Sequence, residues 1–208
     1  METGKSTLDV ARVALRAARD ALPDYARPRS PKKFTQPQLL ACLIVKEFSG
    51  KDYRGVSVML AEWSDLRQTL GLKKAPHFTT LNQAATRLLT KGRWERLLAS
   101  TLAACRRGKL LKARTELAAI DSTGLESRHV SSYFSKRCER HKGHTKRRYP
   151  KLSAVCDTSN HVILGIVVDR GPKPDAIEDE ATLLTGLAHQ WFDTLLADKG
   201  YESERFHS

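Results

Sequence analysis

The stretch LAAIDSTGLE, residues 117–126, places one acidic residue at the end of an apolar run and follows it with small polar residues. The run from Glu116 to Asp121 predicts a short apolar strand that ends in a carboxylate. A carboxylate on a hydrophobic strand is costly to bury unless a positively charged group meets it. The sequence therefore predicts a cationic partner for Asp121.

A second apolar run, TLLAD at residues 194–198, ends in aspartate in the same way. Ligands of open α/β sheets bind beyond the carboxyl ends of the strands, so Asp121 and Asp198 converge if their strands lie side by side and parallel. Adjacent carboxylates repel each other unless a cation lies between them, and Mg²⁺ prefers such oxygen ligands. This pair is our candidate catalytic and metal site. The alternative is that both aspartates only cap turns.

Carboxylates that hold a pair of metal ions suit in-line displacement at phosphorus. One ion activates the attacking hydroxyl and the other stabilises the leaving oxygen, with the ions about 3.5–4 Å apart. Nucleases and strand-transfer enzymes need no protein nucleophile for this reaction. The candidate site therefore favours phosphoryl transfer on nucleic acid.

The residues around the two runs predict the rest of a mixed α/β sheet, in the order β-β-β-α-β. Residues 151–157 alternate as a strand does, and the run 161–169 is apolar enough to predict a strand covered on both faces. A helix is expected to begin near Asp175. Its expected core face consists of Ile177, Ala181, Leu184, Ala188 and Trp191.

Residues 1–112 predict an all-helical region, because their apolar residues recur every three or four positions. Helices are expected over 8–22, 36–48 and 53–70, with a basic, Pro-rich linker over 23–33. Thr80 and Gln83 have capping-box spacing and predict the start of a further helix. A turn before a capped helix with basic residues resembles a helix-turn-helix. Helical hairpins that bind nothing show the same pattern.

The charge of the chain indicates its partner. Lys and Arg number 36 against 23 Asp and Glu, a net charge of +13. A surplus of this size attracts polyanions, of which nucleic acid is the commonest, although a solvated basic surface without a partner has the same composition. No apolar run approaches the roughly 20 residues of a membrane span. Four scattered cysteines favour reduced thiols in the cytoplasm, so a cytoplasmic, nucleoid-associated protein is expected.

A basic segment separates the first two expected strands. Residues 128–151 contain nine Lys or Arg against one acid, Glu139, with three aromatic residues among them. Phosphate contacts here would align DNA with the candidate site and give affinity without sequence choice. The alternative is a solvated basic loop. The expected DNA-binding residues are Arg128, Lys136, Arg137, Lys142, Lys146, Arg147, Arg148 and Lys151, with Arg87 from the helical region.

Three segments together resemble a known family. They are AIDSTGLESRHVSSYF, RRYPKLSAVCDTSNHVILGIVVDRGPKPDAIE and LLADKGYESERF. They resemble the catalytic domain of bacterial insertion-sequence transposases, more narrowly the IS4/IS5-type DDE group with a ribonuclease-H-like core. The resemblance covers about 115–208. It extends into 35–100 through YRGVSVMLAEWSDLRQTLGL and PHFTTLNQAATRL.

The resemblance implies DNA transposition, in which element ends are cleaved and a 3′-hydroxyl then attacks target DNA. It implies divalent metal ions, usually Mg²⁺ (or Mn²⁺), double-stranded DNA at element ends and target, and dimers acting on paired ends. Asp121 takes the family's first acidic position and Asp198 takes the second. The expected domains are an N-terminal helix and linker over 1–33, a helical DNA-binding region over 34–112 and a ribonuclease-H-like catalytic domain over 113–208.

The family's third acid, a glutamate on a helix, is expected well downstream of the second aspartate. The sequence ends ten residues after Asp198, and Glu202 and Glu204 lie too close to the strand for that role. We therefore expect a transposase truncated before its third acid, whose identity is unknown. Two alternatives stay open: a catalytically incomplete DNA-binding fragment that competes with or represses transposition, and a nuclease of the same core that acts on branched DNA.

Overall fold

The computed structural model describes residues 6–29, 31–125, 149–171, 182 and 185–198. The chain forms two compact units, Met1–Ala104 and Cys105–Ser208, and each is described by itself. None of the helices in the described ranges has the length and apolar character needed to cross a membrane.

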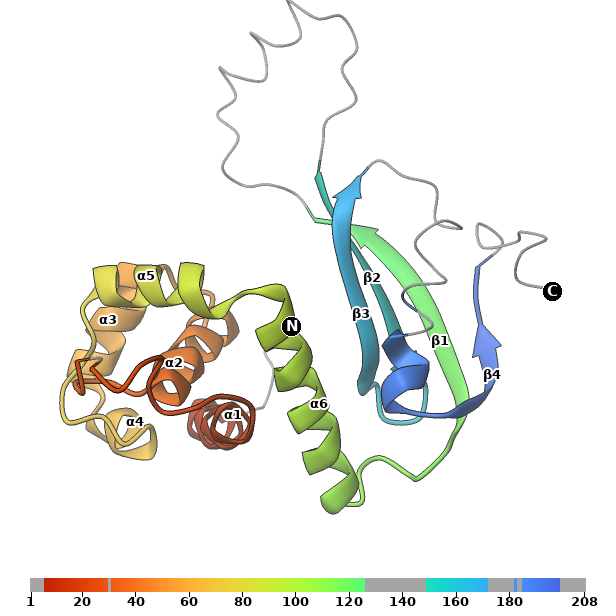
Figure 1. Ribbon diagram of the computed structural model, residues 1–208, viewed down its shortest axis with the longest axis horizontal. Coiled ribbons are helices and arrows are strands. Elements are labelled where there is room, and N and C mark those ends of the chain that lie inside the picture. Colours follow the sequence, from red (N-terminus) through yellow and green to blue (C-terminus); the bar gives the residue numbers. More distant parts are fainter. Residues whose placement is uncertain (1–5, 30, 126–148, 172–181, 183–184, 199–208) are drawn as a thin grey trace, which may run out of the picture. The chain divides into compact units, whose positions relative to one another are not determined.

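The first unit is helical throughout its described residues, as predicted (Figure 1). Its helices are α1 (Thr7–Ala21), α2 (Gln36–Phe48), α3 (Tyr53–Glu62), α4 (Ser64–Thr69), α5 (Phe78–Leu88) and α6 (Lys91–Arg107), the last of which contains the boundary between the units. Apolar side chains of α1 to α5 form one core, in which Ala11, Cys42, Val56, Leu60 and Leu81 are fully buried. Amphipathic helices are expected to build a core in this way.

The predicted helix over 53–70 is two helices, because the chain bends at Trp63, whose ψ of 95° ends α3 and precedes α4. Leu60 and Leu66 are both fully buried. Residues six positions apart lie on different sides of a straight helix, so the bend brings both leucines into the core. The second helix ends before Gly71, as predicted, and the φ of +64° at this residue is a conformation that glycine adopts without strain.

The predicted capping box at Thr80 and Gln83 is wrong. Helix α5 begins two residues before Thr80, and His77 is its N-cap, with a side chain that accepts a hydrogen bond from the Thr79 backbone N–H. The box occurs instead at α2, where Thr35 Oγ1 accepts from Gln38 N at 3.2 Å and Gln38 Oε1 accepts from Thr35 N at 2.9 Å. The same Thr-x-x-Gln spacing thus caps one helix and lies inside another.

The second unit contains a four-stranded mixed sheet, which confirms the predicted fold class and strand order. Its strands are β1 (Thr115–Gly124), β2 (Tyr149–Asp157), β3 (Ile163–Gly171) and β4 (Phe192–Leu196), arranged in the order β3-β2-β1-β4. β2 is antiparallel to β1 and β3, whereas β4 is parallel to β1. Residues 185–189 are helical and lie between β3 and β4 in the chain.

The helical residues 185–189 approach the sheet unusually closely. A Cβ built on Gly165 of β3 would lie 2.4 Å from the backbone nitrogen of Gly186, and one built on Gly186 would lie 3.4 Å from Val155 of β2. Two glycines therefore let the backbone of this helical segment contact the sheet. Ile120, Val155 and Gly165 are neighbours in the register, so they share the face that the helical segment covers.

This close approach corrects the predicted core face of that helix. The buried positions are Thr182 and Gly186, whereas Ala188 is exposed and Trp191 is 62% exposed. A helix that contacts a sheet through glycine needs no large side chain at the contact, which the apolar spacing does not reveal. The other three predicted core residues, Ile177, Ala181 and Leu184, lie outside the described residues.

The opposite face of the sheet is less covered. Along β2 the odd-numbered residues from Lys151 to Asp157 are buried, while the residues between them are half-buried. On β3, Ile163 is 43% and Val168 is 56% exposed, so the prediction that this strand is covered on both faces is wrong. A purely apolar strand sequence does not require that both of its faces are buried in the folded unit.

Candidate catalytic and metal site

Asp121 lies inside β1 and not at its end, because the strand continues three residues further to Gly124. Its Cα partner on β2 is Ala154, which belongs to the half-buried side of that strand. The Asp121 side chain is exposed, and its Oδ1 accepts a hydrogen bond from the Ser122 backbone N–H at 2.7 Å. The carboxylate thus points away from the face covered by residues 185–189.

Asp198 follows β4 by two residues and is exposed. β1 and β4 are neighbouring parallel strands, and their last register pair is Ala119 with Leu196. Asp121 lies two residues after Ala119, and Asp198 lies two residues after Leu196. The paired register ends there, so Asp121 lies on β1 beyond the last pair and Asp198 lies in the segment that follows β4.

The donor chemistry of this pair fits a hard divalent cation. Asp121 on β1 and Asp198 after β4 would supply oxygen ligands and leave the remaining coordination positions open to water or phosphate, as Mg²⁺ requires. In the described part of the chain no group of three or more His, Cys, Asp or Glu side chains forms a metal site. Glu202 and Glu204 lie outside the described residues.

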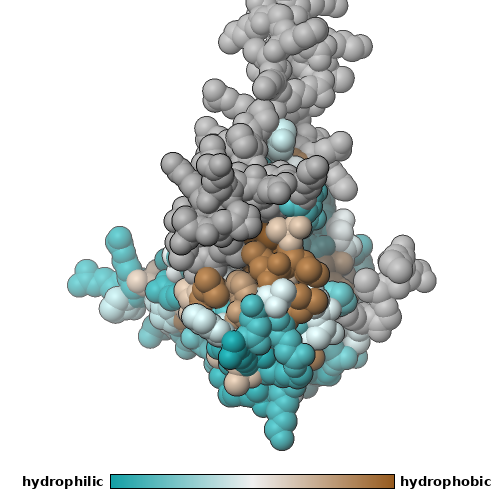
Figure 2. All heavy atoms as spheres, turned by 90° about the vertical axis from the view of Figure 1, so that its right-hand side faces the viewer, coloured by the Kyte–Doolittle hydropathy of each residue, from teal (hydrophilic) through white to brown (hydrophobic). Residues whose placement is uncertain are grey.

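The end of β4 carries exposed apolar surface. Leu196, the register partner of Ala119, is 50% exposed. Figure 2, which views the molecule from the side on which β4 lies in Figure 1, shows hydrophobic side chains gathered on that face.

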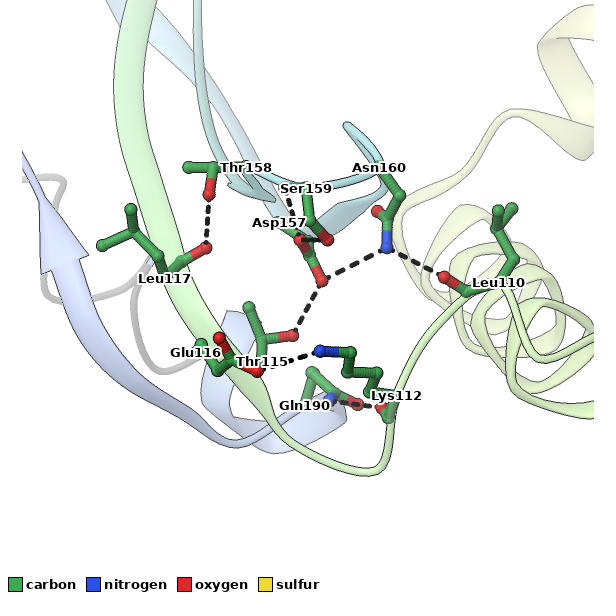
Figure 3. A network of polar contacts seen from close by, with 10 residues as sticks. All are labelled: Leu110, Lys112, Thr115, Glu116, Leu117, Asp157, Thr158, Ser159, Asn160 and Gln190. Carbon is green, nitrogen blue, oxygen red and sulfur yellow. Dashed lines mark hydrogen bonds and ion pairs between the residues drawn. The ribbon is translucent and has the colours of Figure 1, made fainter.

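A third aspartate also follows an apolar run, at the end of β2, and has a different role. Asp157, the last residue of β2, is 4% exposed. Its carboxylate accepts hydrogen bonds from Thr115 Oγ1 at 3.1 Å, from Ser159 N and Oγ at 2.8 and 2.6 Å, and from Asn160 Nδ2 at 3.3 Å (Figure 3). Burial raises the pKa of this carboxyl, but the hydrogen bonds outweigh it and hold the pKa below the ordinary value.

The hydrogen bonds around Asp157 extend to the segment that leads into β1. Asn160 Nδ2 donates to the Leu110 carbonyl and Gln190 Nε2 donates to the Lys112 carbonyl, each at 2.9 Å (Figure 3). Thr115 N also donates to the Trp191 carbonyl. These bonds fix where β1 begins relative to β2 and β4, and thereby the level at which Asp121 lies. Sequence analysis missed Asp157, although its signal, an apolar strand that ends in aspartate before TSN, matches that of the other two.

The predicted DNA-binding residues fall into three groups. Arg128, Lys136, Arg137, Lys142, Lys146, Arg147 and Arg148 lie outside the described residues. Arg87 is exposed on α5. Lys151 is only 4% exposed, on the side of β2 that residues 185–189 cover. A buried ammonium does not reach the phosphates of DNA in solution, so the placement of Lys151 argues against that role and we do not retain it.

The second unit is similar to a known protein family. Residues 112–208 match the family described as Transposase DDE domain, and the match includes all four strands. This part of the chain is a transposase DDE domain. The family predicted from the sequence is confirmed for these residues, and a DDE domain implies DNA transposition with DNA as the substrate. No curated protein and no solved structure matches the chain.

Proposed function

We propose that the protein is a DDE transposase that cleaves and joins DNA strands at insertion-element ends by metal-dependent phosphoryl transfer. The proposal is supported most by the parallel pairing of β1 with β4, whose register would bring Asp121 level with Asp198 if it continued two residues beyond its last pair. Turn-capping aspartates would have no reason to occur at matching levels of adjacent parallel strands. A shared cation gives that reason.

In this proposal the DDE domain binds Mg²⁺ or Mn²⁺ through Asp121 and Asp198. When bound, such ions activate the attacking hydroxyl and stabilise the leaving oxygen. The Ser122 N–H occupies one oxygen of Asp121 and so restricts how the carboxylate turns. The exposed surface beside the pair leaves room for a DNA strand to approach from solvent.

The helical unit is proposed to contribute DNA affinity. Residues 1–104 contain 18 Lys or Arg against 9 Asp or Glu, so this half of the chain carries a net charge of +9 out of +13. Positive charge in this amount gives strong, salt-dependent attraction to a DNA duplex. The basic segment 128–148 would add to it beside the catalytic strands.

The test is to replace Asp121 and Asp198 singly with Asn and to measure Mn²⁺ binding by electron paramagnetic resonance, together with metal-dependent nicking of duplex DNA. We expect each change to weaken Mn²⁺ binding at least tenfold and to abolish nicking, because one carboxylate alone holds the ion poorly. Asp193→Asn is the matched control, since Asp193 lies on β4 and pairs with Arg114. Mn²⁺ binding that survives both changes would exclude the proposed site.

A second candidate is a DNA-binding protein that competes at element ends without catalysis. It is favoured by the concentration of charge in the helical unit, apart from the aspartates. The same experiment separates the two functions. Duplex binding that needs neither aspartate, in a protein that never nicks DNA with Mg²⁺ or Mn²⁺, would support the competitor.

A further inference from the structure

Helix α5 presents a polar face that no other described part of the first unit covers. Leu81, Ala84, Ala85 and Leu88 are buried in the core. The remaining side of the helix is exposed and uniformly polar. It consists of Thr79, Asn82, Gln83, Thr86 and Arg87, which follow one another at the three- and four-residue spacing of a single helix face.

The composition of this face is unusual for a surface helix. An ordinary exposed helix mixes acidic and basic residues, whereas α5 contains no acidic residue at all. Amide, hydroxyl and guanidinium groups are the ones that read base edges in the major groove: Asn and Gln pair with adenine, and Arg pairs with guanine. The face therefore carries recognition chemistry and lacks the carboxylates that would repel phosphate.

The hydrogen-bonding groups of this face are also unused. Within the described residues the side chains of Asn82, Gln83 and Arg87 make no hydrogen bond or ion pair. These two amides and one guanidinium are exposed and hydrated, so leaving them without a protein partner carries no desolvation penalty. Their donors and acceptors are available to a partner.

Positive charge flanks the helix at its N-terminal end. Lys73 and Lys74, in the segment before α5, are exposed. Arg54 of α3 lies beside the first residue of α5, with its guanidinium 4.7 Å from the centre of the Phe78 ring. Such side chains contact phosphates on either side of a groove and orient the helix between them.

The helix is held firmly in this position. Ser57 Oγ of α3 donates to the Pro76 carbonyl at 2.7 Å and fixes the segment that leads into α5. Arg93 donates to the Arg87 carbonyl at the other end. The segment from Leu70 to His77 is longer than the three- or four-residue turn of a helix-turn-helix, so α5 is oriented by its packing on α2 and α3.

We infer that α5 is the helix that reads DNA sequence, with Asn82, Gln83 and Arg87 as the residues that determine specificity. The inference rests on the proposed function and deepens it, because it assigns recognition of the element end to one face of the helical unit. The major groove is about 12 Å wide and admits one α-helix. The phosphate contacts of Lys73, Lys74 and Arg54 supply affinity without sequence choice.

The test uses the full chain and a pool of duplexes with a randomised core. Wild-type protein should enrich one sequence from the pool. Asn82→Ala, Gln83→Ala and Arg87→Lys should each lower the preference for that sequence over a shuffled duplex by about tenfold or more, with binding to the shuffled duplex unchanged. The Arg87→Lys variant retains the positive charge but loses the bidentate hydrogen-bonding geometry of guanidinium. It therefore distinguishes a contact that recognises a base from a purely electrostatic contact.

Matched controls lie on other helices of the same unit. Gln68→Ala on α4 and Arg16→Lys on α1 change exposed residues of the same types and should leave the preference intact. All five positions are on the surface, so equal thermal unfolding temperatures are expected and show that each variant is folded.

The possible failures point to different causes. A sequence preference that persists in all three α5 variants overturns the inference and leaves the proposed function standing, as does weakening that is equal for every duplex. A wild-type chain that binds duplex DNA without enriching any sequence also overturns it, and leaves the polar face as a candidate contact for another protein. A chain that binds no DNA removes both the inference and the proposed function.

Discussion

At the scale of single residues, the three aspartates that follow apolar runs differ only in what surrounds them. Asp121, on β1, and Asp198, after β4, are exposed. Asp157 is buried and surrounded by donors from Thr115, Ser159 and Asn160. A buried carboxylate whose oxygens accept from several protein donors has a structural role, whereas exposed carboxylates stay accessible to ligands from solvent.

The role of Asp157 leads to a prediction about stability. Asp157→Ala should lower the free energy of unfolding by about 2–3 kcal/mol, because it leaves the donors of Thr115, Ser159 and Asn160 without their acceptor. Urea unfolding at neutral pH measures this. Asp65→Ala on the surface of α4 is the control and should change stability by about 0.5 kcal/mol or less.

The same residue should contribute to acid sensitivity. The pKa of Asp157 is lower in the folded protein than its ordinary value, so the unfolded chain binds this proton at a higher pH than the folded chain does. Its contribution to stability is therefore present above the ordinary pKa of about 3.9 and is lost as the pH falls through the lower folded value. Asp157→Asn should flatten the loss of stability below about pH 4, and an unchanged slope would contradict this account.

At the scale of elements, helix ends and strand runs follow the sequence closely, while contacts between elements do not. Gly71 ends α4 where the sequence predicts, because the conformation that stops a helix is a local property of glycine. The bend at Trp63 and the N-cap at His77 were not predicted. The positions of this bend and this N-cap depend on which side chains pack into the core of the helical unit.

The contact between Gly165 and Gly186 gives a prediction at this scale. Gly165→Ala should destabilise the second unit by about 1–3 kcal/mol, because its Cβ would meet the backbone of Gly186 and push residues 185–189 away from β3. Gly92→Ala on α6, where a Cβ meets nothing within 4 Å, is the control and should be neutral or slightly stabilising. Thermal unfolding of both variants checks this, and equal effects would refute the close-packing explanation.

At the scale of the whole molecule, charge governs the encounter with DNA. The net charge of +13 predicts that affinity for any duplex falls steeply with salt. Changing Lys146, Arg147 and Arg148 together to Ala should weaken binding to all sequences alike and reduce the slope of log affinity against log salt by about 2–3. Fluorescence anisotropy at several salt concentrations measures the slope. An unchanged slope would mean that these three residues do not contact phosphate.

The sequence by itself determined the class of each region, the approximate positions of its strands, and the separation along the chain between Asp121 and Asp198. These features depend on the spacing of apolar residues, on the positions of glycines and on the lengths of apolar runs. All three are set by residues that are close together in the sequence. Tertiary structure alone decided that β1 and β4 are adjacent and parallel, and that Asp157 is a structural residue. Pairing between distant strands depends on which backbone groups can form hydrogen bonds with each other and which apolar faces can be buried together in the folded unit. A local sequence pattern does not specify these partners.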